Sequence, residues 1–186
     1  MFQVLSKAIF VVTSAFMLVG CQDHTEKPWQ PTGNLSASSM QDAFATFVGL
    51  CYRLAPGFED FNEEAIALGF RLSPNGWLNH KDGNMTIVLR EHATHDSCQF
   101  AFSATGGDRA FVKRLETPFN ANEISKENYL RLLSLPPGTL SGVRARSFLA
   151  KTNFGGKDAF LTGLILRDAD SRLIDGGYSL KLQVAK

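Results

Sequence analysis

The chain has almost no net charge. Its 186 residues include 19 Lys and Arg against 18 Asp and Glu, which leaves a formal charge of +1 at neutral pH. A nucleic-acid-binding domain carries a basic patch, and a protein attracted to anionic headgroups carries a polybasic segment. The balanced composition therefore argues against nucleic acid as a partner and against a polybasic contact with lipid.

The sequence also lacks the short motifs of common catalytic sites. It has no G-x-S-x-G nucleophile elbow and no C-x-x-C redox motif, and residues 155–157 (Gly-Gly-Lys) lack the spacing of a phosphate-binding loop. Residues 168–177 hold several acids, but Arg172 and Leu173 occupy the positions where an EF-hand needs an acid or amide and then a glycine. We expect no cofactor and favour a non-catalytic role.

No apolar run is long enough to span a bilayer. The longest is residues 8–20, an uncharged stretch of about thirteen residues that follows Lys7, whereas a spanning helix needs roughly twenty. The stretch ends in Leu-Val-Gly and is followed directly by Cys21. A positive start, a short apolar run and small residues at its end are typical of a cleaved targeting peptide.

This arrangement resembles the signal peptide and lipobox of bacterial lipoproteins. The resemblance implies that residues 1–20 are removed and that Cys21 becomes the first mature residue. Cys21 would carry a thioether-linked diacylglycerol and an amide-linked acyl chain, which together bind the protein to a lipid bilayer. Gln22 replaces the Asp that resembles an inner-membrane retention signal, which favours the outer membrane. The alternative is an ordinary secretory signal with a chance cysteine.

Residues 21–37 are polar and contain Pro28, Pro31 and Gly33, without helical or strand periodicity. We interpret them as a lipidated flexible tether that holds the domain, residues 38–186, in the periplasm. Trp29 is the one large aromatic in the tether. Three interpretations stay open for it: a membrane-interface anchor, a contact with the domain, or an incidental aromatic.

Cys51 and Cys98 are the only other cysteines. An exported protein meets an oxidising compartment, so an isolated pair is first interpreted as a disulfide. Closing a loop of nearly fifty residues would stabilise the fold by about 4 kcal/mol at most in the chain-entropy model. Two buried free thiols, or one reactive cysteine, are the alternatives.

The first part of the domain has the period of helices. A helix is expected to begin at Ser38 or Ser39, with one apolar stripe formed by Met40, Ala43, Phe44, Phe47, Val48, Cys51 and Leu54. Because Cys51 lies on the stripe, it should face the core. A shorter helix is expected over residues 60–68, opened by Asp60 in a capping box with Glu63.

From residue 70 the pattern changes to strands. Residues 76–80 and 85–90 flank Lys-Asp-Gly-Asn, a strong hairpin signal, and residues 98–102 should form a third antiparallel strand. Cys98, Phe100 and Phe102 would share one face of that strand. That face should receive the first helix, so that the disulfide links helix to sheet.

The second part repeats this change of pattern. Residues 106–115 should form a short helix with Phe111 and Leu115 inward, and residues 117–141 a connection with an amphipathic turn or two. Strands are expected over residues 143–151, 159–167 and 178–184, with turns at residues 153–156 and 175–177. Gly163 indicates a bulge or close packing. The sequence predicts an α+β domain: antiparallel sheet or sheets, an N-terminal helix pair on one face, and a possible subdivision near residues 117–141.

The densest group of possible metal ligands is His92, His95 and Asp96. Imidazole and carboxylate could hold Zn or Cu if a further ligand came from elsewhere, for example His80 or Glu91. However, the group falls where a hairpin should turn, and His and Asp are common in solvated loops. We therefore assign no metal and keep the three residues as candidates.

Three functions follow as hypotheses. The leading one is a membrane-anchored envelope lipoprotein with a non-catalytic binding or assembly role and an envelope protein as its partner. The second is a hydrolase of envelope material with a polar site near His80, His92 and His95. The third is an inhibitor of a cell-wall-degrading enzyme. Arg144 and Arg146 alternate along one strand and could bind an anionic ligand, although a solvated charge pair at a sheet edge is the simpler interpretation.

Overall fold

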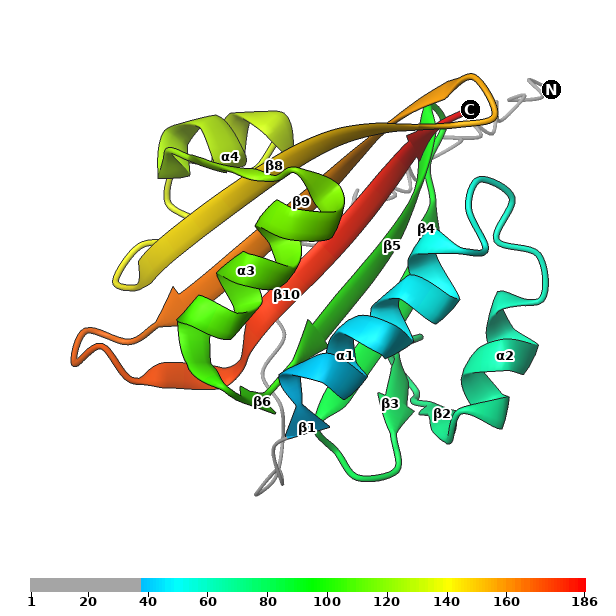
Figure 1. The fold of residues 1–186 in the computed structure, drawn as a ribbon, viewed down its shortest axis with the longest axis horizontal. Coiled ribbons are helices and arrows are strands. Elements are labelled where there is room, and N and C mark those ends of the chain that lie inside the picture. The colour runs from blue at the N-terminus through cyan, green and yellow to red at the C-terminus, as the bar shows by residue number, and fades with distance from the viewer. Residues whose placement is uncertain (1–37) are drawn as a thin grey trace, which may run out of the picture.

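The computed structural model describes residues 38–186, an α+β domain that contains one large sheet (Figure 1). The helices are α1 (Met40–Phe47), the π-helical turn η1 (Val48–Tyr52), α2 (Phe61–Ala67), α3 (Gly107–Phe119) and α4 (Lys126–Leu132). The strands are β1 (Ser38–Ser39), β2 (Phe70–Leu72), β3 (Leu78–His80), β4 (Met85–Glu91), β5 (His95–Phe102), β6 (Ala104–Thr105), β7 (Asn122–Ile124), β8 (Arg144–Phe154), β9 (Lys157–Arg167) and β10 (Leu173–Ala185).

The eight-stranded sheet has the order β2-β3-β4-β5-β10-β9-β8-β7, and all its neighbours are antiparallel. The two strand regions of the sequence join where β5 pairs with β10, which places the C-terminal strand in the middle of the sheet. β1 and β6 form a separate parallel pair of two residues each. The predicted α+β class with an antiparallel sheet is confirmed.

α1 and η1 pack along β5 through three successive contacts. The pairs are Phe44 with Phe102 (ring centroids 6.2 Å apart), Phe47 with Phe100 (6.3 Å) and Cys51 with Cys98, which form a disulfide. All six side chains are at most 4% exposed. Successive residues of the apolar helix stripe therefore contact alternate residues of the strand. The predicted link between helix and sheet is confirmed.

α3 covers the other half of the same face. Phe111 and Leu115 are fully buried, as predicted, and Phe111 lies 5.0 Å from Tyr178 between ring centroids. Gly163 of β9 lies directly beneath the helix, where an added Cβ would collide with Cδ1 of Leu115. Of the two roles expected for Gly163, the structure therefore shows close packing.

α4 packs on the opposite face of the sheet. Tyr129, Leu130 and Leu140 form a second buried cluster with Leu164. Leu164 follows Gly163 on β9, and successive residues of a strand face opposite sides of the sheet. The sheet thus carries helices on both faces. Tyr129 is almost completely buried, and burial raises the pKa of its hydroxyl because the phenolate would be desolvated.

The structure corrects the expected path of the first helix. A single helix should have turned Val48 inward, but the chain widens into a π-helical turn in which N–H of Arg53 donates to C=O of Val48 at 2.8 Å. The five-residue hydrogen-bond step rotates Leu50 and Cys51 inward and leaves Val48 38% exposed. Asp60 precedes α2 with φ of 60°, and its side chain makes no capping hydrogen bond, so the predicted capping box is wrong.

The predicted turn at residues 175–177 is also wrong. These residues lie inside β10, where the register with β9 shifts between Leu173 and Tyr178. The chain reverses earlier, at residues 168–172, where Asp168 accepts a 2.8 Å hydrogen bond from the N–H of Arg172. A glycine pair is compatible with either a turn or a β-bulge. Here the hydrogen bond to Asp168 stabilises the turn at residues 168–172, and the glycine pair lies where the register shifts.

Candidate binding surface

Exposed hydrophobic side chains gather around α2. Of the five large ones exposed in the described part of the chain, four lie on α2, at its end, or on η1 and β2, which contact it: Val48 (38% exposed), Ile66 (59%), Leu68 (48%) and Leu72 (72%). The fifth, Leu135 (37%), follows α4 on the other face of the sheet. We call Val48, Ile66, Leu68 and Leu72 the α2 surface. Single exposed hydrophobics are ordinary, but a group of them is typical of an interaction site.

A cavity of about 280 Å³ lies between α2 and the edge of the sheet. β3 pairs with β4 at only two positions, so the second half of β4 extends past its neighbour toward α2. The notch that remains, here called the edge notch, is lined by Phe61, Asn62, Leu72, Gly76, Leu78, Val88, Leu89 and Glu91. Five of the eight lining residues have large apolar side chains, Asn62 adds an amide, and Glu91 is the one charged residue among the described ones.

A second cavity, of about 260 Å³, lies on the other flank of α2, against α1 and η1. It is lined by Ala45, Thr46, Gly49, Leu50, Arg53, Glu64 and Leu68. Nη2 of Arg53 is 4.0 Å from Oε2 of Glu64, and both side chains are largely exposed. An exposed ion pair of this kind contributes at most about 1 kcal/mol to stability, so it is a weak link across this cavity.

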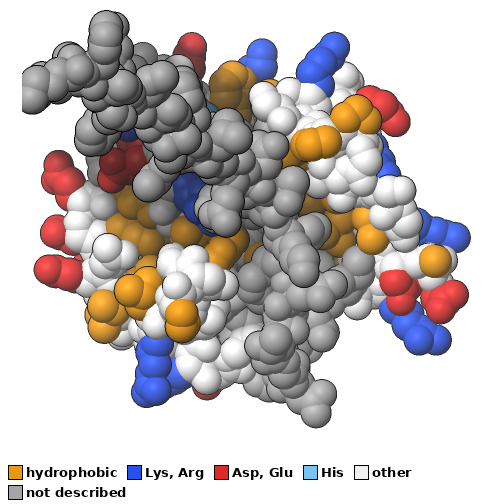
Figure 2. Space-filling model, turned by 180° about the vertical axis from the view of Figure 1, so that it is seen from behind, with side chains coloured by type: hydrophobic (Ala, Val, Ile, Leu, Met, Phe, Trp, Pro, Cys, Tyr) orange, Lys and Arg blue, Asp and Glu red, His pale blue; other side chains and the backbone are white. Residues whose placement is uncertain are grey.

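The charge near α2 is predominantly acidic. Four exposed acids stand within six residues: Glu59, Asp60, Glu63 and Glu64. The last two lie in the first turn of the helix, where they also interact favourably with its dipole. In Figure 2, which brings the α2 side of Figure 1 to the left, acidic side chains line that margin and hydrophobic ones gather beside them. A partner surface that complements these acids and hydrophobic side chains would be basic and apolar.

The predicted histidine group lies at the opposite end of β4 from His80. The rings of His92 and His95 stack 4.4 Å apart, and Asp96 forms a 3.1 Å ion pair with Lys186. Nε2 of Gln183 lies 3.1 Å from Nε2 of His95. Burial, and then the nearby charges of His92 and Lys181, hold the pKa of His95 below its ordinary value.

His80 is hydrogen-bonded elsewhere. Its Nε2 lies 3.1 Å from C=O of Leu68, and its neighbour Asn79 pairs with Thr86 near the start of β4. Thr86 and Glu91 are five residues apart on one strand, which is about 16 Å. The structure therefore does not bring His80 together with His92 and His95 as the hydrolase hypothesis requires.

In the chain from residue 38 onward, no group of three or more His, Cys, Asp or Glu is placed to hold a metal. Two of the three candidates, His92 and His95, lie ring on ring with an interplanar angle of 20°. Asp96 instead pairs with Lys186 at the end of β10. These contacts bind the turn between β4 and β5 to the C-terminal strand.

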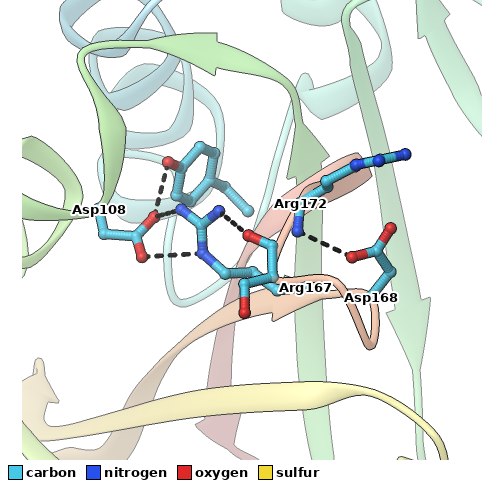
Figure 3. A network of polar contacts seen from close by, with 6 residues as sticks. Asp108, Arg167, Asp168 and Arg172 are labelled. Atoms are coloured by element: carbon cyan, nitrogen blue, oxygen red, sulfur yellow. Dashed lines mark hydrogen bonds and ion pairs between the residues drawn. The ribbon is translucent and has the colours of Figure 1, made fainter.

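A charged network joins α3 to the sheet (Figure 3). Asp108 accepts hydrogen bonds from Nε of Arg167 at 3.1 Å and from the hydroxyl of Tyr178 at 3.0 Å. Burial alone would raise the pKa of Asp108, but the hydrogen bonds from Arg167 and Tyr178 outweigh it and lower the pKa. Burial and then the bond to Asp108 raise the pKa of Tyr178 to about 12. Arg167 and Tyr178 both donate to Asp108, so each polar group has a partner within the fold, which is typical of a structural contact.

The two candidate arginines for anion binding are engaged within the fold. Arg146 donates to both carboxylate oxygens of Glu123, at 3.0 and 2.8 Å, and Arg144 donates to the hydroxyl of Ser171. The hydrogen bonds from Arg146 lower the pKa of Glu123. Both arginines project from β8 on the face that carries α3, as their alternation predicted.

Cys21, the predicted lipidation site, lies outside the described residues, as do the signal peptide and the tether. Cys51 and Cys98, the predicted disulfide, are bonded, with Cα atoms 5.5 Å apart. From residue 38 onward, none of the helices has the length and apolar character needed to cross a membrane.

Comparison with protein-family models, with curated proteins and with solved structures found no match for this chain.

The α2 surface was missed in the sequence, although a signal for it was present. Phe61 and Ala65 form the buried stripe of α2, and Ile66 falls on another side of the helix. A large hydrophobic away from the core stripe of a short helix indicates a second contact surface. Leu68 and Leu72 gave no such signal, because Leu68 follows Phe61 at the helical period and Leu72 shares a strand face with buried Phe70, so both resemble core residues.

Proposed function

We propose that this chain is a lipid-anchored protein of the bacterial envelope with a non-catalytic binding or assembly role. In this proposal Cys21 carries the lipid, the domain lies in the periplasm, and the outer membrane is the favoured location. The observation that carries the binding role is the α2 surface, whose exposed hydrophobics lie beside two cavities and near four exposed acids. The partner we propose is an envelope protein with an apolar, basic surface.

The pairing of charged side chains with one another inside the domain supports this choice over the hydrolase. Asp108, Arg146 and Asp96 each have an ion-pair partner within the fold, and His80 is far from the other two candidate histidines. A hydrolase needs polar groups that converge on one cavity. The edge notch, by contrast, has Asn62 and Glu91 as the only polar side chains among its described lining residues.

Site-specific photo-crosslinking in intact cells tests the proposal. A photoreactive residue replaces Leu72 or Ile66 in the full-length chain, and Leu135, an exposed leucine on the other face, is the matched control. We expect one dominant protein adduct from positions 72 and 66, absent from position 135, and lost when Leu68→Asp is added. Equal adducts from all three positions, or none from positions 72 and 66, would refute docking on the α2 surface.

A further inference from the structure

We infer that the edge notch binds an extended segment of the protein partner, which adds antiparallel to β4. A large apolar side chain of that segment fills the notch opposite Leu89, and a basic side chain lies opposite Glu91. This inference rests on the proposed function and specifies the chemistry of the partner. It combines three observations: the backbone edge of β4, the face on which the notch opens, and the charge at its end.

The backbone of β4 presents hydrogen-bonding groups at this edge. N–H of His92 donates to C=O of His95 at 2.9 Å, so the backbone groups of His92 point toward β5. In an antiparallel pair these groups alternate in direction along the strand, so those of Leu89 and Glu91 point away from β5. The pairing of β3 with β4 ends at Leu78 and Ile87, and within the described chain no strand pairs with this edge beyond that point.

The side chains of the same two residues face the notch. Ile87, Leu89 and Glu91 are every second residue of β4, so their side chains share the sheet face that carries α1. Leu89 and Glu91 line the cavity together with Phe61 of α2. Residues that pair across two strands project on the same face. A segment residue opposite Leu89 would therefore direct its side chain into a cavity of about 280 Å³, which has room for one large side chain.

Charge complementarity selects the neighbouring residue. Glu91 is exposed and is the only charged residue among the described residues of the lining, and the four acids of the α2 region extend the negative potential. In an antiparallel pair the residue opposite Glu91 precedes the one opposite Leu89 by two positions. The recognised pattern, read from the N-terminus, is therefore basic-x-apolar. This is strand addition, in which main-chain bonds give affinity and alternate side chains give specificity.

The intervening residue x provides the sharpest test, because its N–H points away from β4. The probe is a nine-residue peptide with Lys-Thr-Phe at its centre between threonine and serine residues, titrated into the detergent-solubilised mature chain. We expect saturable binding. N-methylation of the Phe nitrogen should weaken it at least ten-fold, whereas N-methylation of the central Thr nitrogen should leave it unchanged.

A charge exchange provides the second arm. Glu91→Lys should weaken the Lys-Thr-Phe peptide at least ten-fold, and a Glu-Thr-Phe peptide should regain affinity for that variant. Equal effects of the two N-methyl groups, or no change with Glu91→Lys, would overturn the inference. So would self-association of the chain that Glu91→Lys abolishes, because the edge would then serve a second copy. If peptides fail while crosslinking still depends on Leu68, the inference falls and the proposed function stands.

Discussion

At the scale of single residues, the clearest contact is the one made by Asp108. Its side chain is 24% exposed, and it is hydrogen-bonded to Arg167 of β9 and Tyr178 of β10 from the first turn of α3. Charge-assisted hydrogen bonds at a partly buried site are stronger than exposed ion pairs. The contact therefore fixes the start of α3 over the sheet.

Asp108→Asn should lower the free energy of unfolding at pH 7 by about 1–3 kcal/mol, because hydrogen bonds to a charged group are replaced by weaker ones. The pKa of Asp108 is lowered in the folded state, so its contribution is present above the ordinary pKa of 3.8 and is lost as pH falls. The difference between wild type and variant should therefore be constant near neutrality and narrow below about pH 4. Denaturant titration at a series of pH values measures it.

Glu123→Gln is the matched control for Asp108→Asn. The pair of Glu123 with Arg146 has the same chemistry, but its side chains are 50% and 45% exposed. Its removal should cost at most about 1 kcal/mol. If the two substitutions cost the same, the assignment of Asp108 as the stronger contact is contradicted.

At the scale of elements, the contact between α3 and β9 depends on Gly163. Gly163→Ala places a methyl group against Leu115 and Phe111 in a fully packed region, and overpacking costs about 1–3 kcal/mol. Gly138→Ala, where nothing lies within 4 Å of the added Cβ, should be nearly neutral. Thermal unfolding of both variants checks this, and equal midpoints would contradict close packing at Gly163.

The disulfide is the covalent link between η1 and β5. Cys51→Ala with Cys98→Ala should lower the free energy of unfolding by up to about 4 kcal/mol, because the unfolded chain loses a 47-residue constraint. Chemical denaturation of the oxidised wild type and the double variant measures the loss. Reduction of the wild type should reproduce it, and a loss below about 1 kcal/mol would contradict a stabilising role.

The sequence predicts elements well where one period persists over several turns or strand residues. The stripe of α1, the alternation of Cys98, Phe100 and Phe102, and the C-terminal strands were all found this way. The predictions fail where side-chain hydrogen bonds or the local winding of a helix determine the backbone path. The three cases are the π-helical turn at Val48, the start of α2 and the turn at Asp168. These are choices between nearly equal local conformations, which tertiary contacts settle.

The candidate site was less predictable than the fold, for a physical reason. The edge notch exists because β3 is shorter than β4 and α2 lies beside the gap, so its lining comes from four separate segments. No local pattern records how far one strand extends past another. The histidines that looked concentrated in the sequence are divided between the two ends of β4, because this strand of seven residues separates them.

At the scale of the whole molecule, we propose an acidic and apolar docking surface on a domain that a lipid at Cys21 holds at a membrane. We expect that Cys21→Ser abolishes metabolic labelling of the protein with a palmitate analogue, because the proposed lipid attachment is at that residue. Labelling is detected on the purified chain after extraction of free lipid. Labelling that survives the substitution would contradict the lipoprotein assignment, and Cys98→Ser is the control that should retain it.

The affinity of the mature chain for the partner that crosslinks at position 72 tests the central claim most directly. Isothermal titration compares the wild type with Leu72→Asp and with Leu135→Asp, two substitutions of exposed leucines on different faces of the domain. We predict that Leu72→Asp weakens binding at least ten-fold, while Leu135→Asp binds as the wild type does. Equal affinities for all three chains would contradict a docking role for the α2 surface.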